Sequence, residues 1–286
     1  MKRAYIKYFL ALLLFGTNGI VASMISLTSY EIVLLRTLVG SLLLIAIFYL
    51  RRNKLTFWKN KKHFVFLAVS GIAMGTSWLF LYEAYAQIGV SIASLCYYAG
   101  PVIVMIVSPF IFREKMTITK LLSFSLVIVG IILVNGQGDE KINLFGVLCG
   151  LASALMYSLM VVFNKRAKSI TGLENSMLQL FIAFLTVAMF VLFKQGCVIH
   201  ITPSDILPML VLGLLNTGVG CYLYFSSIGE LPVQTVAICG YLEPLSAVIF
   251  SVLLLGEKML PLQIVGAVLI IGSAAVGEYM SIKKEK

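Results

Sequence analysis

Two charged side chains fall inside long apolar segments of the sequence. Arg36 lies within the run 31–50, and Glu243 lies near the middle of the run 233–255. A charge at the centre of a membrane-spanning helix costs about 2.5–3.5 kcal/mol on insertion scales, and such residues commonly bind a ligand, pair with each other or carry protons. Arg36 would clamp a carboxylate, or it would extend toward the nearby end of its segment. Glu243 would carry a proton, or it would stay neutral and hydrogen-bonded to a tyrosine.

Polar aromatic and amide side chains accompany these two charges. Trp78 and Tyr82 are four residues apart and therefore share one helix face, with Glu83 beside them. An aromatic belt at the membrane surface is the alternative explanation for such residues. The candidate substrate-binding residues are Asn18, Arg36, Trp78, Tyr82, Glu83, Tyr97, Tyr98, Pro101, Tyr157, Asn216, Tyr222, Tyr241, Glu243 and Pro244, and Glu243 is also the candidate proton-coupling group.

Two prolines interrupt corresponding apolar segments. Pro101 would free the backbone carbonyl of Tyr97, and Pro244 that of Gly240, because proline has no N–H and crowds the preceding turn. Freed carbonyls at membrane depth must face protein or a wet cavity. A symmetric pair of interrupted spans predicts a midplane cavity lined by both, whereas simple kinks are the alternative.

The sequence lacks the marks of membrane-embedded catalysis. It contains no GxxxxGK[ST] motif for phosphate binding. His63 and His200 lie at segment edges, and Asp139 and Asp205 lie in loops, so no catalytic triad or histidine-rich metal site can form within the membrane. The odd number of cysteines, five, disfavours a disulfide framework. We expect neither an enzyme nor a bound metal or cofactor.

Composition indicates a membrane protein. Hydrophobic residues make up 60% and charged residues only 12% of the 286-residue chain, against about 25% charged residues in soluble domains. The segment 8–25 is interpreted as a retained first span, and the short stretch Gln87-Ile88-Gly89 after the third span predicts a tight hairpin with the fourth. The ten predicted spans are 8–25, 31–50, 64–86, 91–112, 118–135, 144–163, 176–194, 206–226, 233–255 and 261–280.

The net charge of +10 is distributed unevenly over the predicted loops. If the N-terminus is cytoplasmic, eighteen basic residues fall on the cytoplasmic side and three on the other. This is the positive-inside pattern. It predicts that both termini are cytoplasmic, and it accounts for the charge without a nucleic-acid partner.

The sequence also repeats itself at an offset of 143 residues, half of the chain. Tyr98 matches Tyr241, Pro101 matches Pro244, and the triplet Glu-Lys-Met recurs at 114–116 and 257–259. Residues 1–138 and 139–286 are thus predicted to be two related halves, joined by a hydrophilic hinge at 135–143. Five spans per half would insert the second half upside down, so we predict an all-α polytopic membrane protein with ten transmembrane helices in two inverted five-helix repeats.

A mid-span proline, a Glu-Lys pair and a glycine-containing last span occur in each half. In this order they are Pro101, Glu114-Lys115 and Gly130, and then Pro244, Glu257-Lys258 and Gly266. This doubled pattern resembles the EamA domains of the drug/metabolite transporter superfamily over essentially the whole chain, although Arg113 stands where the second half has Gly256. The resemblance implies a bacterial inner-membrane carrier, with many relatives exporting amino acids or related metabolites.

We therefore expect a secondary transporter in the plasma membrane that exports small metabolites by alternating access, with a proton as the candidate coupling ion. Arg36 and Glu243 would hold a zwitterionic or anionic substrate. The alternatives are an exporter of lipophilic cations, a lipid-headgroup flippase and a non-transporting membrane scaffold. The oligomeric state is not predicted.

Overall fold

A computed structural model describes residues 2–113, 117–135, 143–196, 199, 201–255, 261–262, 264–266, 268–270, 272–273 and 276. The described residues form helices and connecting turns, with no strand among them. The helices are α1 (Lys2–Gly16), α2 (Asn18–Ala22), α3 (Ser29–Leu50), η1 (Phe57–Lys59), α4 (Lys61–Tyr97), α5 (Ala99–Phe112), α6 (Ile118–Asn135), α7 (Leu144–Arg166), α8 (Gly172–Gln195), α9 (Pro203–Leu210), the π-helical η2 (Val211–Val219), α10 (Gly220–Ile228), α11 (Val233–Gly240) and α12 (Leu242–Leu255).

Six helical stretches are long and apolar enough to cross a membrane. They are Lys2–Ala22, Ser29–Leu50, Lys61–Ile88, Leu144–Arg166, Gly172–Gln195 and Pro203–Ile228, and α5 is a shorter apolar helix. The prediction of an all-helical, polytopic membrane protein is therefore confirmed. Nine of the twenty residues of the tenth predicted span, both Glu-Lys turns and most of the predicted hinge lie outside the described residues.

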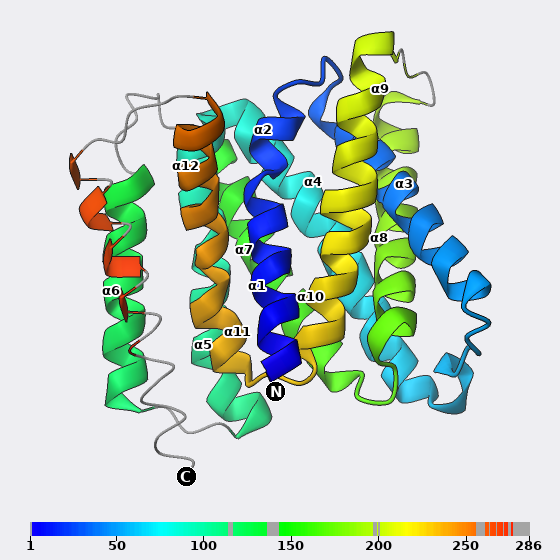
Figure 1. Cartoon of the computed structure of the whole chain (residues 1–286), viewed down its shortest axis with the longest axis horizontal. Coiled ribbons are helices and arrows are strands. Elements are labelled where there is room, and N and C mark those ends of the chain that lie inside the picture. Colours follow the sequence, from blue (N-terminus) through cyan, green and yellow to red (C-terminus); the bar gives the residue numbers. More distant parts are fainter. Residues whose placement is uncertain are drawn as a thin grey trace.

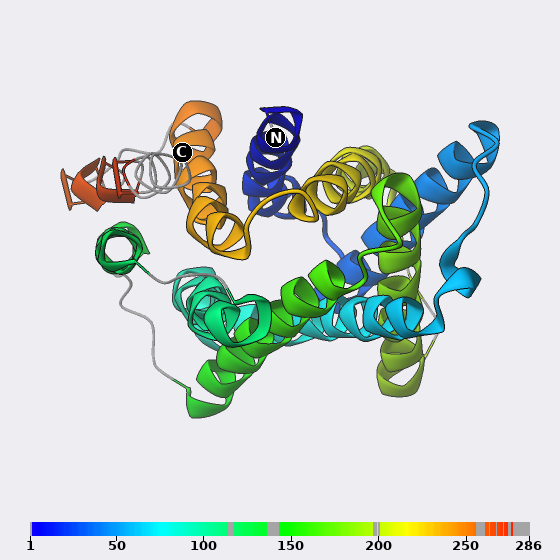
Figure 2. The ribbon, with the colours of Figure 1, turned by 90° about the horizontal axis from the view of Figure 1, so that it is seen from below.

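The long helices stand side by side, so the molecule has two recognisable ends (Figure 1). One end carries α2 and the start of α9, and we call it the α9 end. The opposite end carries the N-terminus and η1, and we call it the N-terminal end (Figure 1). Viewed along the helices, α4 and α7 cross the middle of the bundle, and α1, α10 and α12 form one of its sides (Figure 2).

Both prolines sit just after a break between two helices. The break between α4 and α5 falls at Tyr98, with φ −69° and ψ −2°, and the break between α11 and α12 falls at Tyr241, with φ −71° and ψ −6°. Pro101 and Pro244 then occupy the first turn of the following helix, where a missing N–H leaves no helical bond unmade. The predicted interruption of both segments is confirmed.

The residues of the predicted loop at 87–89 have helical conformation within α4. The chain nevertheless reverses direction within α4. Along α4, the residue numbers of the α7 partners first fall and then rise again. The contacts are, in order, Ser77 with Ser153, Ile88 with Gly146, and Cys96 with Gly150. The expected hairpin is therefore made without a separate loop.

Irregular backbone also marks α1 and α9. Thr17 separates α1 from α2, and η2 on the facing segment is a nine-residue π-helix, a conformation that is rare and concentrated at functional sites. Helix α9 begins with a capping box between Thr202 and Asp205. Asp205 also accepts hydrogen bonds from the backbone N–H and the hydroxyl of Ser26, which fastens α9 to the chain before α3.

The N-terminal end of the bundle is closed by a packed core. The Tyr8 hydroxyl donates a hydrogen bond to the backbone carbonyl of Val236 at 2.7 Å. Tyr8, Phe48 and Val236 belong to one cluster of buried side chains that joins α1, α3 and α11. This packing leaves the interior of the bundle accessible from the α9 end.

Candidate functional site

A cavity of about 350 Å³ enters the bundle from the α9 end. It begins beside Ser23 and Ser29, at the end of α2 and the start of α3, and reaches Arg36 and Glu243 in the interior. A deeper part continues from these two residues to a floor formed by α4, α7 and α10. The volume is at the lower end of the range for small-molecule sites, which starts at roughly 300 Å³.

Arg36 points into this cavity from α3. Its side chain is only 3% exposed, so it does not extend to the surface. Nε donates a hydrogen bond to the Thr217 hydroxyl at 2.9 Å, and the Nη atoms contact the Tyr82 hydroxyl at 3.3 Å and Asn18 Oδ1 at 3.5 Å. The guanidinium carbon lies 4.8 Å from the ring centre of Trp78, a cation–π distance.

The polar side chains around Arg36 are fixed by the two irregular segments. Asn216 of η2 donates to the Leu14 carbonyl at 3.0 Å, to the Thr17 hydroxyl at 2.8 Å and to Asn18 Oδ1 at 3.0 Å. Asn216 therefore donates to a backbone carbonyl next to the break at Thr17, and it orients the Asn18 side chain toward Arg36. Thr217, next along η2, donates in turn to the Leu212 carbonyl at 2.8 Å. The π-helix and the α1–α2 break thus support the arginine together.

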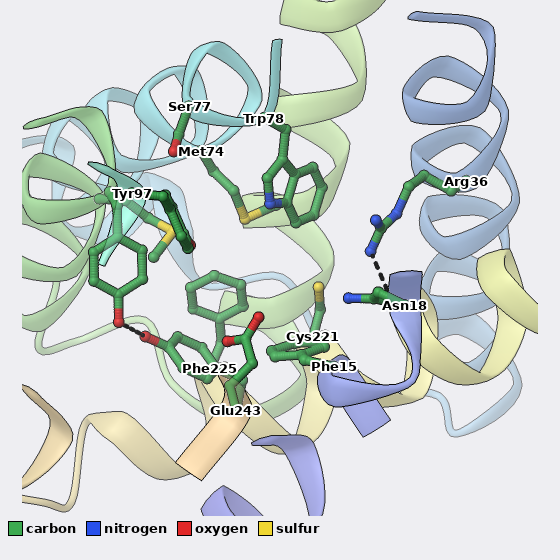
Figure 3. Close-up of a pocket in the computed structure, with 13 residues that line it drawn as sticks. Phe15, Asn18, Arg36, Met74, Ser77, Trp78, Tyr97, Cys221, Phe225 and Glu243 are labelled. Carbon is green, nitrogen blue, oxygen red and sulfur yellow. Dashed lines mark hydrogen bonds between the residues drawn. The ribbon is translucent and has the colours of Figure 1, made fainter. Parts of the chain in front are cut away.

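Glu243 reaches the cavity from α12, two residues after the break at Tyr241. In the close-up its carboxylate and the Arg36 guanidinium enter the same pocket from different helices (Figure 3). Within the part of the chain that the structure describes, Lys194–Glu83 is the only salt bridge, so neither Arg36 nor Glu243 has an ion-pair partner there. The two charges therefore face a shared space.

Aromatic rings line the walls of the same space. Trp78 and Tyr97 of α4 contribute to both the entrance and the deep part. Tyr82 and Tyr98 line the entrance only, and Tyr157 of α7 lines the deep part. The Tyr157 and Tyr224 hydroxyls lie 3.3 Å apart. Eight of the predicted residues are thereby brought to one cavity: Asn18, Arg36, Trp78, Tyr82, Tyr97, Tyr98, Tyr157 and Glu243.

The remaining predicted residues lie elsewhere. Glu83 lies on a different face of α4, where it pairs with Lys194 at 3.3 Å. Tyr222 lies on α10, with the ammonium of Lys7 over its ring. Asn216 stands behind the cavity as a support. Tyr241 and the two prolines, Pro101 and Pro244, are buried at the helix breaks and do not line the cavity.

Several residues that line the cavity or support Arg36 are not among the predicted ones. Thr217 binds Arg36 directly, and nothing in its sequence context marks it. Tyr224 had a usable signal, because it is a tyrosine in the same span as the predicted Tyr222. The other additional residues of the deep part are Phe15, Met74, Ser77, Met160, Cys221 and Phe225.

This arrangement suits recognition of a small molecule rather than catalysis. A guanidinium has five N–H donors, and the hydrogen bonds to Thr217, Tyr82 and Asn18 use three of them. Two donors remain for a ligand carboxylate. No group of three or more His, Cys, Asp or Glu side chains that could hold a metal ion occurs within the described residues.

Comparison with known proteins places these features in a family. The profile of the EamA-like transporter family matches residues 2–136 and again residues 144–276. The Bacillus subtilis (strain 168) protein named "Uncharacterized transporter YxxF" is 23% identical over 96% of this chain and 88% of its own length. A Clostridium kluyveri protein named "Uncharacterized transporter" is 24% identical over 99% of this chain and 95% of its own.

One solved crystal structure shares the fold, with a TM-score of 0.83 and 18% sequence identity over 97% of this chain and 98% of that chain. The family match covers nearly the whole sequence, and the family consists of membrane transporters, not enzymes. The chain therefore belongs to the EamA-like transporter family of the drug/metabolite transporter superfamily, as its doubled sequence pattern predicted.

Proposed function

We propose that this transporter is a secondary carrier that exports amino acids or similar small metabolites across the plasma membrane. The observation that carries the proposal is the shared cavity of Arg36 and Glu243, which holds one positive and one negative side chain with no ionic partner for either within the described residues. Charges buried in this way are costly unless a ligand or a proton compensates them.

The substrate class follows from the two charges. The carboxylate of a zwitterion would take the two remaining donors of Arg36, and its ammonium would face Glu243. The rings of Trp78 and Tyr97 would contact the apolar part of the molecule. A lipophilic cation would leave the buried arginine uncompensated beside a second positive charge, so the cavity favours the zwitterion.

The proposed topology has ten spans in two inverted halves, residues 1–138 and 139–286, with both termini in the cytoplasm. Equivalent helix breaks at Tyr98 and Tyr241 support the relation between the halves. The basic loop at 51–62 and the basic residues at the end of α7 support the orientation, because they gather at the N-terminal end (Figure 1).

In that orientation the structure represents an outward-facing state. The cavity opens at the α9 end, and Tyr8, Phe48 and Val236 close the cytoplasmic end. Transport would require this seal to open while the α9 end closes, with the two halves rocking around the breaks that flank the cavity. We propose Glu243 as the group that carries a coupling proton during this cycle, because its carboxylate accepts no hydrogen bond from the described residues.

Counterflow in proteoliposomes tests this function. Vesicles loaded with one unlabelled amino acid or metabolite at a time should accumulate its labelled form only when it is a substrate. Arg36→Gln should abolish exchange while the protein elutes as a folded species, and Arg36→Lys should recover little, because a single ammonium cannot replace the guanidinium fork. Unchanged exchange by Arg36→Gln would disprove the carboxylate clamp. Exchange of lipophilic cations alone, or of no soluble compound, would favour the drug, lipid or scaffold alternatives.

A further inference from the structure

A second pocket, of about 380 Å³, lies on the outer face of the bundle and is separate from the Arg36 cavity. The two pockets share no lining residue. It is bounded by α3, α4, α7 and α8, and α7 and α8 diverge on the side that α4 crosses (Figure 2). Its lining residues are Tyr30, Thr76, Leu79, Phe80, Glu83, Phe145, Cys149, Thr186, Phe190 and Lys194.

The polar side chains of this pocket are concentrated at one end. Lys194 lies next to the last residue of α8 and Tyr30 is the second residue of α3, both at the α9 end. The Lys194 ammonium contacts the Tyr30 hydroxyl at 2.7 Å and Glu83 Oε2 at 3.3 Å. The polar end therefore presents one positive and one negative charge close to the membrane surface.

The rest of the pocket extends toward the middle of the membrane and is apolar. Thr76 lies seven residues before Glu83 on α4, and Thr186 lies eight residues before Lys194 on α8, so the pocket reaches roughly 10–12 Å deeper along the helix axes. Both threonine positions are partly buried, and Thr186 satisfies its hydroxyl by donating to the Ile182 carbonyl. Leu79 and Phe80 form the apolar wall between these levels.

The pocket is open to the surroundings of the bundle. Phe145 is 55% exposed and Phe190 is 39% exposed, and both belong to helices that cross the membrane. The Lys194 side chain is 46% exposed, whereas that of Glu83 is 19% exposed. A molecule in this pocket would thus have its polar part at the interface and its apolar part beside lipid.

We propose that this groove binds one phospholipid whose headgroup carries both a phosphate and a primary ammonium. The Lys194 ammonium has three N–H donors and uses two of them on Tyr30 and Glu83, so one remains for the phosphate. Glu83 accepts one bond from Gln87 and one from Lys194, so its oxygens keep lone pairs for the lipid ammonium. An acyl chain lies against Leu79, Phe80 and Phe145.

Native mass spectrometry of the delipidated full-length protein tests this site. Two probes with identical acyl chains are compared, one with an ethanolamine phosphate headgroup and one with a glycerol phosphate headgroup. Wild type should retain one ethanolamine lipid more strongly than the glycerol lipid. Lys194→Gln should weaken ethanolamine-lipid binding about tenfold, because a charged hydrogen bond is lost. Glu83→Gln should remove the preference between the two headgroups.

Two further variants keep the result decisive. Thr186→Phe fills the apolar part without changing a charge, so it should lower the occupancy of either lipid. Lys168→Gln, an exposed lysine at the N-terminal end, should bind like wild type. Equal retention of both lipids by every variant, stronger retention of the glycerol lipid, or binding that Thr186→Phe leaves unchanged would each overturn the proposal. If Lys194→Gln does not fold, the lipid binding of Glu83→Gln and Thr186→Phe tests the proposal by itself.

Discussion

The Tyr241 hydroxyl donates a hydrogen bond to the backbone carbonyl of Tyr98, at 2.9 Å across 143 residues of sequence. Each tyrosine stands at the break of its own helix pair, with nearly the same backbone angles. Their rings also meet edge to face, with centroids 6.5 Å apart. The two interrupted segments are therefore joined at their equivalent points, directly beside the cavity that Tyr98 lines.

Removing that hydrogen bond should weaken the junction between the breaks. Tyr241→Phe leaves the buried ring in place but deprives the Tyr98 carbonyl of its donor, which should cost about 1 kcal/mol and lower the midpoint of thermal unfolding in detergent. Tyr98→Phe is the matched control, because the carbonyl at this position, not the hydroxyl, accepts the bond. Equal midpoints for the two variants would show that the bond does not stabilise the junction.

Thr217 should set the affinity for substrate by holding Arg36. Thr217→Val keeps the shape of the side chain but removes the acceptor for Arg36 Nε. Because a hydrogen bond to a charged group contributes about 1.5–3 kcal/mol, we expect the KM for exchange to rise about tenfold or more. The measurement is exchange rate against substrate concentration in proteoliposomes.

Thr37→Val is the control for this change. Thr37 lies on the same helix as Arg36, and among the described residues its hydroxyl donates only to the carbonyls of Val33 and Leu34 on that helix. Its KM should remain close to that of wild type. A similar rise in KM for both valine variants would mean that Thr217 acts through general packing and not through the arginine.

Cys221 should report directly on occupancy of the cavity. Its side chain lines the deep part together with Glu243. In a protein that keeps only this cysteine, substrate should slow labelling by a small polar thiol reagent added from the α9 side. The control protein keeps only Cys96, which packs against Gly150 away from the cavity. Substrate protection of Cys96 alone, or of neither cysteine, would place the binding site elsewhere.

Much of the architecture was predictable because membrane insertion imposes strong and simple patterns. Long apolar runs, the prolines after Tyr98 and Tyr241, and the rarity of charge inside a span each predict structure from sequence. The same rules identified Arg36 and Glu243, since both residues are expensive in hydrocarbon. Repetition strengthened the prediction of the breaks, because the same irregularity occurs twice.

The direction in which a side chain points was harder to predict. Tyr82 and Glu83 are neighbours on α4, so their side chains leave the helix roughly 100° apart, and only Tyr82 contacts Arg36. Tyr222 and Tyr224 differ by roughly 200° in the same way, and only Tyr224 reaches the cavity. Periodicity cannot choose between faces when both are apolar.

The residues of the cavity floor were harder still to predict from the sequence. Phe15, Cys221 and Phe225 are ordinary constituents of apolar helices, and their place in the cavity arises from how α1 and α10 pack against each other and face α4 across the cavity. The π-helix of η2 is also invisible in the sequence, although it brings Thr217 to Arg36 and Asn216 to Asn18. Tertiary packing, which a single sequence does not reveal, decides these positions.

The most direct measurement of the central claim is substrate flux in proteoliposomes with and without an imposed pH gradient, for wild type, Glu243→Gln and Arg36→Gln. The gradient should drive accumulation of substrate by wild type. Glu243→Gln should retain exchange but lose the response to the gradient, and Arg36→Gln should lose both. Gradient-driven accumulation that persists in Glu243→Gln, or full exchange by Arg36→Gln, would contradict the assignment of these two residues to a shared transport site.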